Sequence, residues 1–411
     1  MINGVARFSY NLATGLARRG HEVLVLTPSQ NKKRHTEIMD GVRVVYLHSS
    51  TIKVYPDQIH DIEPAKVLFG KKLPKVFYKH GLKTSLFPAE QIKRVLDSFR
   101  PDVVHVQGSD PLGIAVVSYA KKHQIPLVMT EHNQPEVLTE SLPIPRLFRG
   151  PVNNALSSYF VNRQSKADYA TMPTELSISN LKKKHKIDVP VEAVSNGVDL
   201  TLFKPGEVNE HLYNKYGISR DALILLYVGR VDPEKNLGFV LRAFADFLYR
   251  HKLDELSKTL FLIVGDGVDK ERLAGEAIDM GISLSVRFLG KITGPDLADI
   301  YRLGDVFVTA SEIETQGIVL IEAAASGLPL IAVNGGAVAE ICRNNLNGFL
   351  LEPGDKEGMV EAMTRLLTDA ELRRKMSAES VKIADSHSLE RTLDRFVDIY
   401  NKVIKRGVNN F

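Results

Sequence analysis

The chain has 411 residues, of which 44% are hydrophobic and 25% are charged, a composition typical of a folded globular protein with room for two domains. The single cysteine, Cys342, cannot form an internal disulfide, which excludes a disulfide-stapled scaffold and fits a reducing, cytoplasmic compartment. We expect no membrane-spanning segment, because the uncharged stretch 323–339 is interrupted by glycine, proline and asparagine.

The net charge of +4 is divided unevenly along the chain. Residues 1–200 carry 27 Lys and Arg against 18 Asp and Glu, whereas residues 201–411 carry 26 against 31. A basic first half predicts contact with an anionic surface or acceptor. The alternative is chance variation of surface charge.

Hydrophobic periodicity predicts a helix over residues 1–20, followed by strands over 21–27 and 41–47. In a doubly wound α/β domain, a central strand normally precedes the first helix. No strand precedes Asn3, so we expect that the sequence lacks the first strand of this domain and the turn that follows it.

Residues 64–89 form a basic segment without any acidic residue. Apolar side chains alternate with its six lysines, which are Lys66, Lys71, Lys72, Lys75, Lys79 and Lys83. Such a segment can lie on an anionic membrane surface. The alternative is a solvated excursion of the surface with a few packed aromatic residues.

The rest of the first half alternates helices and strands. We expect helices over 92–99, 111–123, 152–166 and 174–184, and strands over 102–106, 126–130 and 191–194. His132 follows the strand 126–130, where a histidine can hydrogen-bond a substrate hydroxyl or shuttle a proton. A lone histidine is more often structural, which is the alternative for His132.

The second half reads as a regular alternation of strands and helices, which predicts a parallel sheet. The expected strands are 223–228, 260–264, 286–289, 306–309, 330–333 and 348–351, and a final helix covers 388–403. Turn residues and the change in charge place the domain boundary near residue 200.

Polar residues follow the strand 223–228 at its carboxyl end. Gly229 permits a tight turn, Arg230 can bind phosphate oxygens through two parallel hydrogen bonds, and Lys235 adds a mobile positive charge. These residues predict an anion site. The alternative is a pair of solvated surface cations, which is how Arg and Lys usually occur.

Residues 305–336 read as strand, loop, helix and strand, with Glu314 in the loop and Glu322 in the helix. An ionised carboxylate only accepts hydrogen bonds, so each glutamate suits the diol of a sugar or ribose. The first amides of the helix, at residues 317–319, carry partial positive charge and suit a phosphate. The alternative is two surface glutamates on an ordinary strand–helix unit.

The spacing of the two glutamates, with Gly317 between them and Gly327 and Pro329 after them, resembles the E-x7-E motif of the retaining glycosyltransferases of family four. Gly229-Arg230 followed by Lys235 is similar to that family's diphosphate clamp. His132 lies two residues after Thr130, the last residue of the expected strand 126–130, and resembles the active-site histidine of that family. The resemblance covers the whole chain apart from the missing first strand.

This resemblance implies the GT-B fold, an α/β architecture of two Rossmann-like parallel-sheet domains that face a cleft. Residues 1–200 would form the acceptor-binding domain and 201–385 the donor-binding domain, with a helix over 386–411 crossing back to the first domain. His132 and Glu314 are the expected catalytic residues. The expected donor-binding residues are Gly4, Arg230, Lys235, Gly317, Ile318, Val319 and Glu322.

No two aspartates are separated by a single residue, so the D-x-D metal motif of the other main glycosyltransferase fold is absent. We therefore expect neither metal nor cofactor, with cations and helix amides neutralising the leaving diphosphate of a nucleotide-sugar donor.

Thr315-Gln316 resembles the corresponding pair in diacylglycerol glucosyltransferases of this family. The resemblance implies transfer of a hexose from UDP-glucose to a membrane lipid such as diacylglycerol, at the inner face of the membrane. Four alternatives remain: a GDP-mannose-dependent transferase, a soluble or polysaccharide acceptor, a sugar-nucleotide epimerase, and a non-catalytic sugar-nucleotide-binding protein. We expect no nucleic-acid partner.

Overall fold

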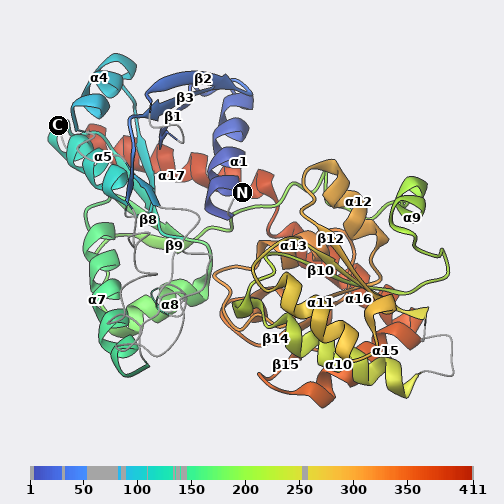
Figure 1. Ribbon diagram of the computed structural model, residues 1–411. Coiled ribbons are helices and arrows are strands. Elements are labelled where there is room, and N and C mark those ends of the chain that lie inside the picture. The colour runs from blue at the N-terminus through green and yellow to red at the C-terminus, as the bar shows by residue number, and fades with distance from the viewer. Residues whose placement is uncertain are drawn as a thin grey trace, which may run out of the picture. The chain divides into compact units, whose positions relative to one another are not determined.

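The computed structural model describes residues 4–29, 33–52, 82–84, 89–108, 110–132, 135, 139, 146–251 and 258–409 (Figure 1). The chain divides into two compact units, the first made of Met1–Ser195 and Leu393–Phe411 and the second of Asn196–Thr392. The roles expected for residues 1–200, 201–385 and 386–411 stay predictions. Five of the six lysines of the basic segment, from 66 to 79, lie outside the described residues, as does the side chain of Lys83.

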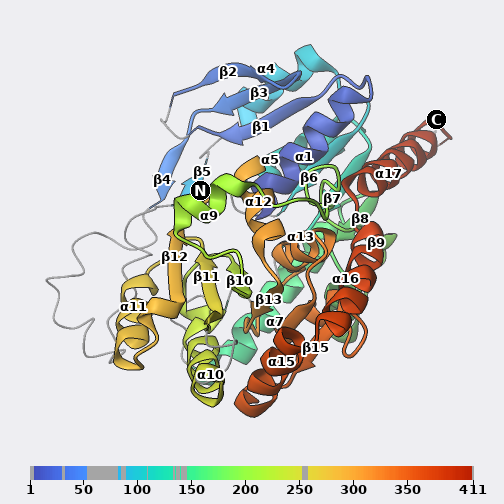
Figure 2. The same ribbon diagram turned by 90° about the vertical axis from the view of Figure 1, so that its right-hand side faces the viewer.

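A six-stranded sheet of order β12-β11-β10-β13-β14-β15 forms the centre of the second unit (Figure 2). Its strands, all paired in parallel, are β10 (Ile224–Val228), β11 (Leu260–Val264), β12 (Val286–Gly290), β13 (Val306–Thr309), β14 (Leu330–Val333) and β15 (Gly348–Leu351). Each strand predicted for this half is present within one residue of its expected limits. The order reverses between β10 and β13, and open α/β sheets bind ligands at the carboxyl ends of strands where this happens.

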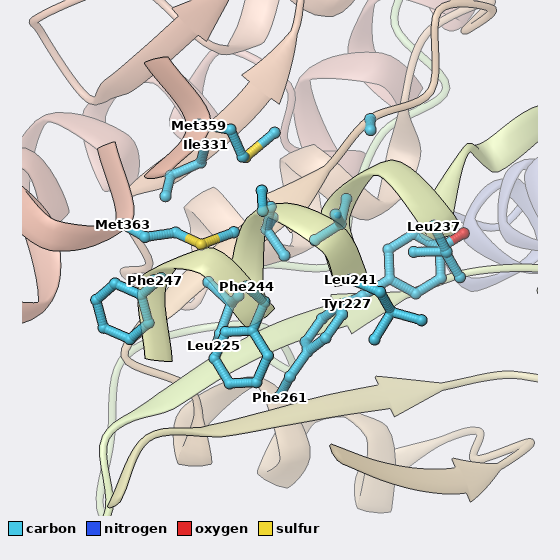
Figure 3. Close-up of a cluster of buried hydrophobic side chains, with 14 of the residues drawn as sticks. Leu225, Tyr227, Leu237, Leu241, Phe244, Phe247, Phe261, Ile331, Met359 and Met363 are labelled. Carbon is cyan, nitrogen blue, oxygen red and sulfur yellow. The ribbon is translucent and has the colours of Figure 1, made fainter. Parts of the chain in front are cut away.

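Side chains alternate across this sheet and produce two apolar layers. Leu225, Tyr227 and Phe261 pack on one face against α10 (Leu237–Arg250) and α15 (Lys356–Thr368) (Figure 3). Leu226 and Phe307 pack on the other face against α12 (Pro295–Leu303) and α13 (Ile318–Ala325). Burial of each such side chain stabilises the folded state by about 1.5–3 kcal/mol. The sheet that carries the polar loops at its strand ends is therefore firmly packed on both faces.

Further helices and two 3-10 turns complete the described part of the second unit. They are the helices α9 (Glu210–Tyr216), α11 (Lys270–Asp279), α14 (Val338–Ile341) and α16 (Ala370–Asp385), with the 3-10 turns η2 (Pro233–Lys235) and η4 (Ser283–Ser285). Of these, η2 lies in the loop that follows β10 and ends at Lys235.

The first unit contains two larger sheets within the described residues. One has the order β1-β3-β2 and the other is the parallel sheet β6-β7-β8-β9. The strands are β1 (Leu24–Pro28), β2 (His35–Met39), β3 (Val42–Leu47), β6 (Val104–Gln107), β7 (Leu127–Thr130), β8 (Tyr169–Met172) and β9 (Val191–Ala193), with a small pair of β4 (Ser50–Ile52) and β5 (Leu82–Thr84). The strands β2, β4, β5 and β8 were not predicted from the sequence. The expectation of a missing first strand stays a prediction.

In the described part of the first unit, these sheets are accompanied by the helices α1 (Gly4–Arg18), α4 (Ala89–Phe99), α5 (Pro111–Lys122), α7 (Arg146–Gln164) and α8 (Glu175–Lys184). The last helix, α17 (Leu389–Asn409), begins in the second unit and continues in the first. There its Phe396 is fully buried, and Arg395 pairs with Glu192 of β9. None of the helices in the described ranges combines the length and the apolar character needed to cross a bilayer.

Candidate active site

The loop after β11 holds the loop after β10 in place. The backbone N–H of Gly229 donates to the oxygen of Val264 at 2.9 Å, and that of Val231 donates to the oxygen of Asp266 at 3.1 Å. Gly265, with a φ of 139°, lies so close that a Cβ there would be 1.7 Å from the oxygen of Gly229. No larger residue fits, so this contact fixes the backbone that follows β10.

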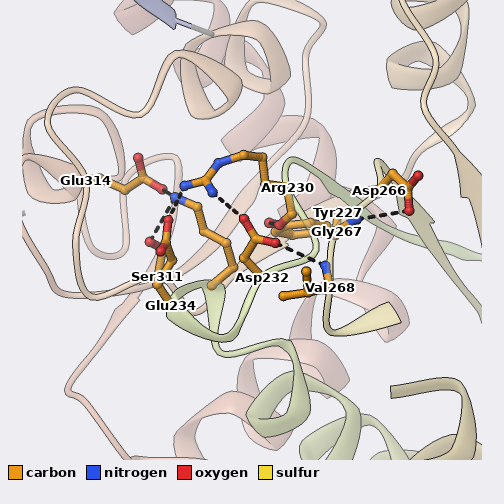
Figure 4. A network of polar contacts seen from close by, with 10 residues as sticks. Tyr227, Arg230, Asp232, Glu234, Asp266, Gly267, Val268, Ser311 and Glu314 are labelled. Carbon is orange, nitrogen blue, oxygen red and sulfur yellow. Dashed lines mark hydrogen bonds and ion pairs between the residues drawn. The ribbon is translucent and has the colours of Figure 1, made fainter. Parts of the chain in front are cut away.

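The guanidinium of Arg230 pairs with two carboxylates of its own loop, those of Asp232 and Glu234 (Figure 4). The hydroxyl of Tyr227 donates to the backbone oxygen of Arg230 at 2.7 Å and anchors the same residue. The Arg230 side chain keeps 49% of its surface exposed, so a dissolved anion can reach it while the carboxylates orient it. The sequence analysis predicted Arg230 but missed both acids, although their positions two and four residues later were a usable signal.

Lys235 and Glu314 form an ion pair at the carboxyl ends of β10 and β13. The Nζ of Lys235 donates to Oε1 of Glu314 at 2.6 Å and to Oγ of Ser311 at 3.3 Å. The side chains of the pair are only 15% and 16% exposed, so solvent screens their attraction less than that of surface charges. The sequence analysis predicted both charged residues, but it did not predict their contact and missed Ser311.

Two glycines of the loop after β14 fix the backbone of Glu314. The carbonyl oxygen of Glu314 accepts a hydrogen bond from the backbone N–H of Ala337 at 2.9 Å. A Cβ on Gly335 would lie 2.4 Å from the oxygen of Glu312, and one on Gly336 would lie 2.1 Å from the oxygen of Glu314. Neither position accepts a side chain, so the Glu314 carboxylate extends from a constrained backbone.

Helix α13 begins after Gly317, which adopts a left-handed conformation with a φ of 76°. Within the part of the chain that the structure describes, the backbone N–H groups of Ile318 and Val319 donate to no protein acceptor. First-turn amides of this kind carry partial positive charge and bind anions. The preceding Gln316 is held in place, because its Oε1 accepts from the backbone N–H of Asn196 at 3.1 Å.

The carboxylate of Glu322 lies inside the second unit, with 1% of the residue exposed. The hydroxyl of Tyr301, from α12, donates to Oε2 of Glu322 at 2.9 Å. Tyr301 is itself fully buried, with its ring 5.6 Å from that of Phe203. The structure therefore does not bring Glu322 into the Lys235–Glu314 pair, and its expected contact with a ribose stays a prediction.

His132 and Gly4 belong to the first unit. His132 follows β7, is 6% exposed and lies with its Nε2 2.9 Å from Oε1 of Gln107 on β6. Its ring centroid is 4.9 Å from that of Phe8 on α1, the helix that Gly4 begins as an exposed residue. Burial lowers the pKa of His132 from 6.5 to about 4, so its imidazole is neutral at pH 7. The sequence analysis missed Gln107, for which it had no signal.

Two family models cover almost the whole chain. The model described as Glycosyltransferase Family 4 matches residues 2–202, and the model described as Glycosyl transferases group 1 matches residues 208–382. The chain belongs to the glycosyltransferases of family four.

Relatives of this glycosyltransferase include two proteins named alpha-monoglucosyldiacylglycerol synthase. The one from Streptococcus pneumoniae is 28% identical over 353 residues, which are 85% of this chain and 72% of the relative. The one from Acholeplasma laidlawii is 26% identical over 363 residues, which are 87% of this chain and 83% of the relative.

A solved structure of a sucrose-phosphate synthase from Thermosynechococcus elongatus is similar to this chain with a TM-score of 0.75. The two share 20% sequence identity, and the similarity covers 98% of this chain and 94% of the other. It shows that the fold of this glycosyltransferase is GT-B, which confirms the fold class expected from the sequence.

The second unit of this glycosyltransferase provides groups of complementary chemistry near one another. Lys235, Arg230 and the first amides of α13 can neutralise a diphosphate, while the carboxylate of Glu314 can accept hydrogen bonds from sugar hydroxyls. In the described ranges, no group of three or more His, Cys, Asp or Glu side chains could hold a metal ion. Independence from metal ions stays a prediction.

Proposed function

We propose that this glycosyltransferase moves a hexose from a nucleoside-diphospho-sugar to an acceptor hydroxyl and retains the anomeric configuration. The observation that carries the proposal is the partly buried Lys235–Glu314 pair beside the amino end of α13, at the point where the strand order reverses. There a cation and helix amides for a diphosphate lie next to a carboxylate for a sugar. The ammonium and the carboxylate are 2.6 Å apart, which is close enough for one bound donor to contact both.

The proposed reaction breaks the bond between the anomeric carbon and the diphosphate oxygen. The acceptor oxygen bonds to the same face of that carbon, and the proton of the acceptor hydroxyl passes to the departing diphosphate. Lys235, Arg230 and the amides of Ile318 and Val319 stabilise the negative charge that develops on the leaving group. Glu314 orients the sugar, Glu322 holds the ribose, and His132 contacts a hydroxyl of the sugar or acceptor. Gly4, at the start of α1, is a further proposed donor-binding residue.

We favour a membrane lipid such as diacylglycerol as the acceptor and UDP-glucose as the donor. The names of the two relatives and the Thr315-Gln316 pair support this choice. A further support is α7, which has no acidic residue and exposes Leu147 and Phe148 by 81% and 55% next to Arg149. Exposed apolar side chains on a helix without acidic residues suit an anionic lipid surface, and we propose that the enzyme lies at the inner face of a membrane.

A donor screen with lipid extract and soluble glycans as acceptors tests the proposed function. We expect a radiolabelled hexose to pass from UDP-glucose to a lipid, with the α-linkage of the product established by NMR. Transfer from GDP-mannose, or to a soluble glycan, would overturn the choice of substrates and keep the reaction class. Isomerisation of the donor without acceptor, or donor binding without turnover, would overturn the transferase itself.

A further inference from the structure

His132 is held by an amide side chain rather than by a charged partner. Gln107 and His132 lie at the carboxyl ends of the neighbouring parallel strands β6 and β7, and the Nε2 of His132 is 2.9 Å from Oε1 of Gln107. Phe8 covers the ring from α1 at a centroid distance of 4.9 Å. Within the described residues, no hydrogen bond is made by the other ring nitrogen of His132, Nδ1.

A second histidine, His105, lies next to the amide nitrogen of Gln107. The amide nitrogen of Gln107 lies 3.1 Å from Nε2 and 3.2 Å from Nδ1 of His105. The ring of His105 is itself fixed at both nitrogens, by the hydroxyl of Tyr400 at 2.7 Å and by the hydroxyl of Thr130 at 2.6 Å. Thr130 continues the network to Thr171 on β8 at 2.6 Å. The hydrogen-bonded chain therefore runs from α17 through two strands to His132.

The imidazoles of His105 and His132 are both neutral at pH 7. Burial lowers the pKa of His105 to about 3, with a smaller contribution from the nearby His132, and burial lowers the pKa of His132 to about 4. A neutral imidazole has one N–H and one bare nitrogen. The amide of Gln107 is directional, because its nitrogen only donates and its oxygen only accepts. The oxygen of this amide lies 2.9 Å from Nε2 of His132 and can only accept, so Nε2 of His132 carries the proton.

We propose that Gln107 is a positioning residue that holds His132 in the tautomer protonated at Nε2. The bare Nδ1 then accepts a hydrogen bond from a hydroxyl group, and His132 cannot donate to a carbonyl or phosphate oxygen. The use of that hydroxyl contact in catalysis rests on the proposed function, whereas the tautomer does not. The amide nitrogen of Gln107 packs against the ring of His105, which restricts how the amide can turn.

Nitrogen NMR of protein with labelled histidine tests this inference directly, since the chemical shift of Nδ1 distinguishes a bare from a protonated nitrogen. The chain has 12 histidines, so the His132→Gln variant identifies the signal of His132. We expect wild-type His132 to show a bare Nδ1 and Gln107→Leu to show a mixture of both tautomers. Gln107→Glu keeps an oxygen that accepts from Nε2–H, so it should restore the bare Nδ1.

Turnover provides the second measurement. Gln107→Leu should lower kcat about tenfold, the change expected for loss of one hydrogen bond, while the affinity for UDP stays unchanged. The matched control is Gln91→Leu on α4, whose amide accepts from the backbone of His48 and should change neither quantity. A protonated Nδ1 in the wild type, or an unchanged tautomer in Gln107→Leu, would overturn the inference. A bare Nδ1 together with full activity of His132→Gln would instead overturn the proposed role of His132.

Discussion

The ammonium nitrogen of Lys235 lies 2.6 Å from Oε1 of Glu314, although the proposed reaction uses the two groups on different parts of the donor. Lys235 is assigned to the leaving diphosphate and Glu314 to the sugar. Their pairing keeps two poorly exposed charges neutralised, which avoids the penalty of an unpaired buried charge. A diphosphate that takes over Lys235 would therefore release the Glu314 carboxylate for the sugar hydroxyls. Under the proposed function, donor binding would therefore be coupled to release of the carboxylate.

Replacement of Glu314 by glutamine should reduce kcat about 100- to 1,000-fold, since the amide cannot supply the same charge to the transition state. The affinity for UDP should stay the same or rise, because Lys235 loses its competing carboxylate. Steady-state kinetics and calorimetric titration with UDP measure the two effects. The matched control is Glu312→Gln, an exposed glutamate of the same loop. Near-wild-type turnover in Glu314→Gln would remove the residue from its assigned role.

Replacement of Arg230 by glutamine should weaken the binding of UDP by roughly 10- to 100-fold, the range for loss of hydrogen bonds to a charged group. The two carboxylates that orient Arg230 would then face the diphosphate without a cation between them, which adds repulsion. Calorimetric titration measures the affinity. Arg242→Gln is a suitable control, because Arg242 pairs with Glu276 between α10 and α11. Equal losses in both variants would indicate a general effect of charge rather than a diphosphate contact.

Replacement of Tyr301 by phenylalanine removes the hydroxyl that donates to Oε2 of Glu322 at 2.9 Å. The buried carboxylate loses a hydrogen bond, so the free energy of unfolding should fall by about 1–3 kcal/mol. Urea unfolding followed by circular dichroism measures this loss, since the chain has no tryptophan for fluorescence. If Glu322 also holds the ribose, the affinity for UDP falls more than that for free diphosphate. Equal changes for the two ligands would contradict the ribose contact.

The sequence predicted the second unit well because its strands are uninterrupted apolar runs that are buried on both faces, as in β10 and β14. It missed β2 because that strand, His35–Met39, is almost entirely exposed and carries no apolar run. It missed β8, Tyr169–Met172, because the residues Tyr-Ala-Thr-Met are neither an uninterrupted apolar run nor a regular alternation of apolar and polar residues. Hydrophobic pattern reports burial, so elements without a distinctive burial pattern escape it.

The sequence likewise predicted some features of the candidate site and not others. Lys235 and Glu314 follow strand ends, which the sequence can recognise, but their contact depends on the order β10-β13, which joins strands 81 residues apart in the first paired position. The constraint that Gly336 puts on the backbone of Glu314 could not be predicted either, because it depends on how closely the two loops approach each other. Gln107 gave no signal either, since an amide on a strand has many uses. Only the pairing of β6 with β7 brings it to His132.

Activity should survive removal of divalent ions. Lys235, Arg230 and the amides of α13 already supply positive charge for the leaving diphosphate, so no further cation is required. We expect the initial rate after dialysis against EDTA to match that of the untreated enzyme. Restoration of lost activity by added magnesium or manganese would contradict the metal-independent reading, whereas a loss that no metal restores would indicate damage to the protein.

The first unit should lose stability as the pH falls from 6.5 toward 4. Burial lowers the pKa of His132 to about 4 in the folded state, against 6.5 for an ordinary histidine. Above pH 6.5 the ring is neutral in both states, and its contribution to stability is fully present. Below pH 6.5 the imidazole of His132 binds a proton in the unfolded chain but stays neutral in the folded chain. Unfolding therefore becomes more favourable. At pH 5 the loss for this one ring is about 2 kcal/mol.

Urea unfolding at pH 7.5 and pH 5 in the wild type and in His132→Gln measures this contribution. The glutamine cannot titrate, so the variant should lose about 2 kcal/mol less than the wild type between the two pH values. Replacement of the exposed His21 by glutamine, in the same unit, serves as the control for the substitution itself. Identical losses in the wild type and in His132→Gln would show that the ring is protonated alike in both states, and would contradict the burial on which the neutral imidazole depends.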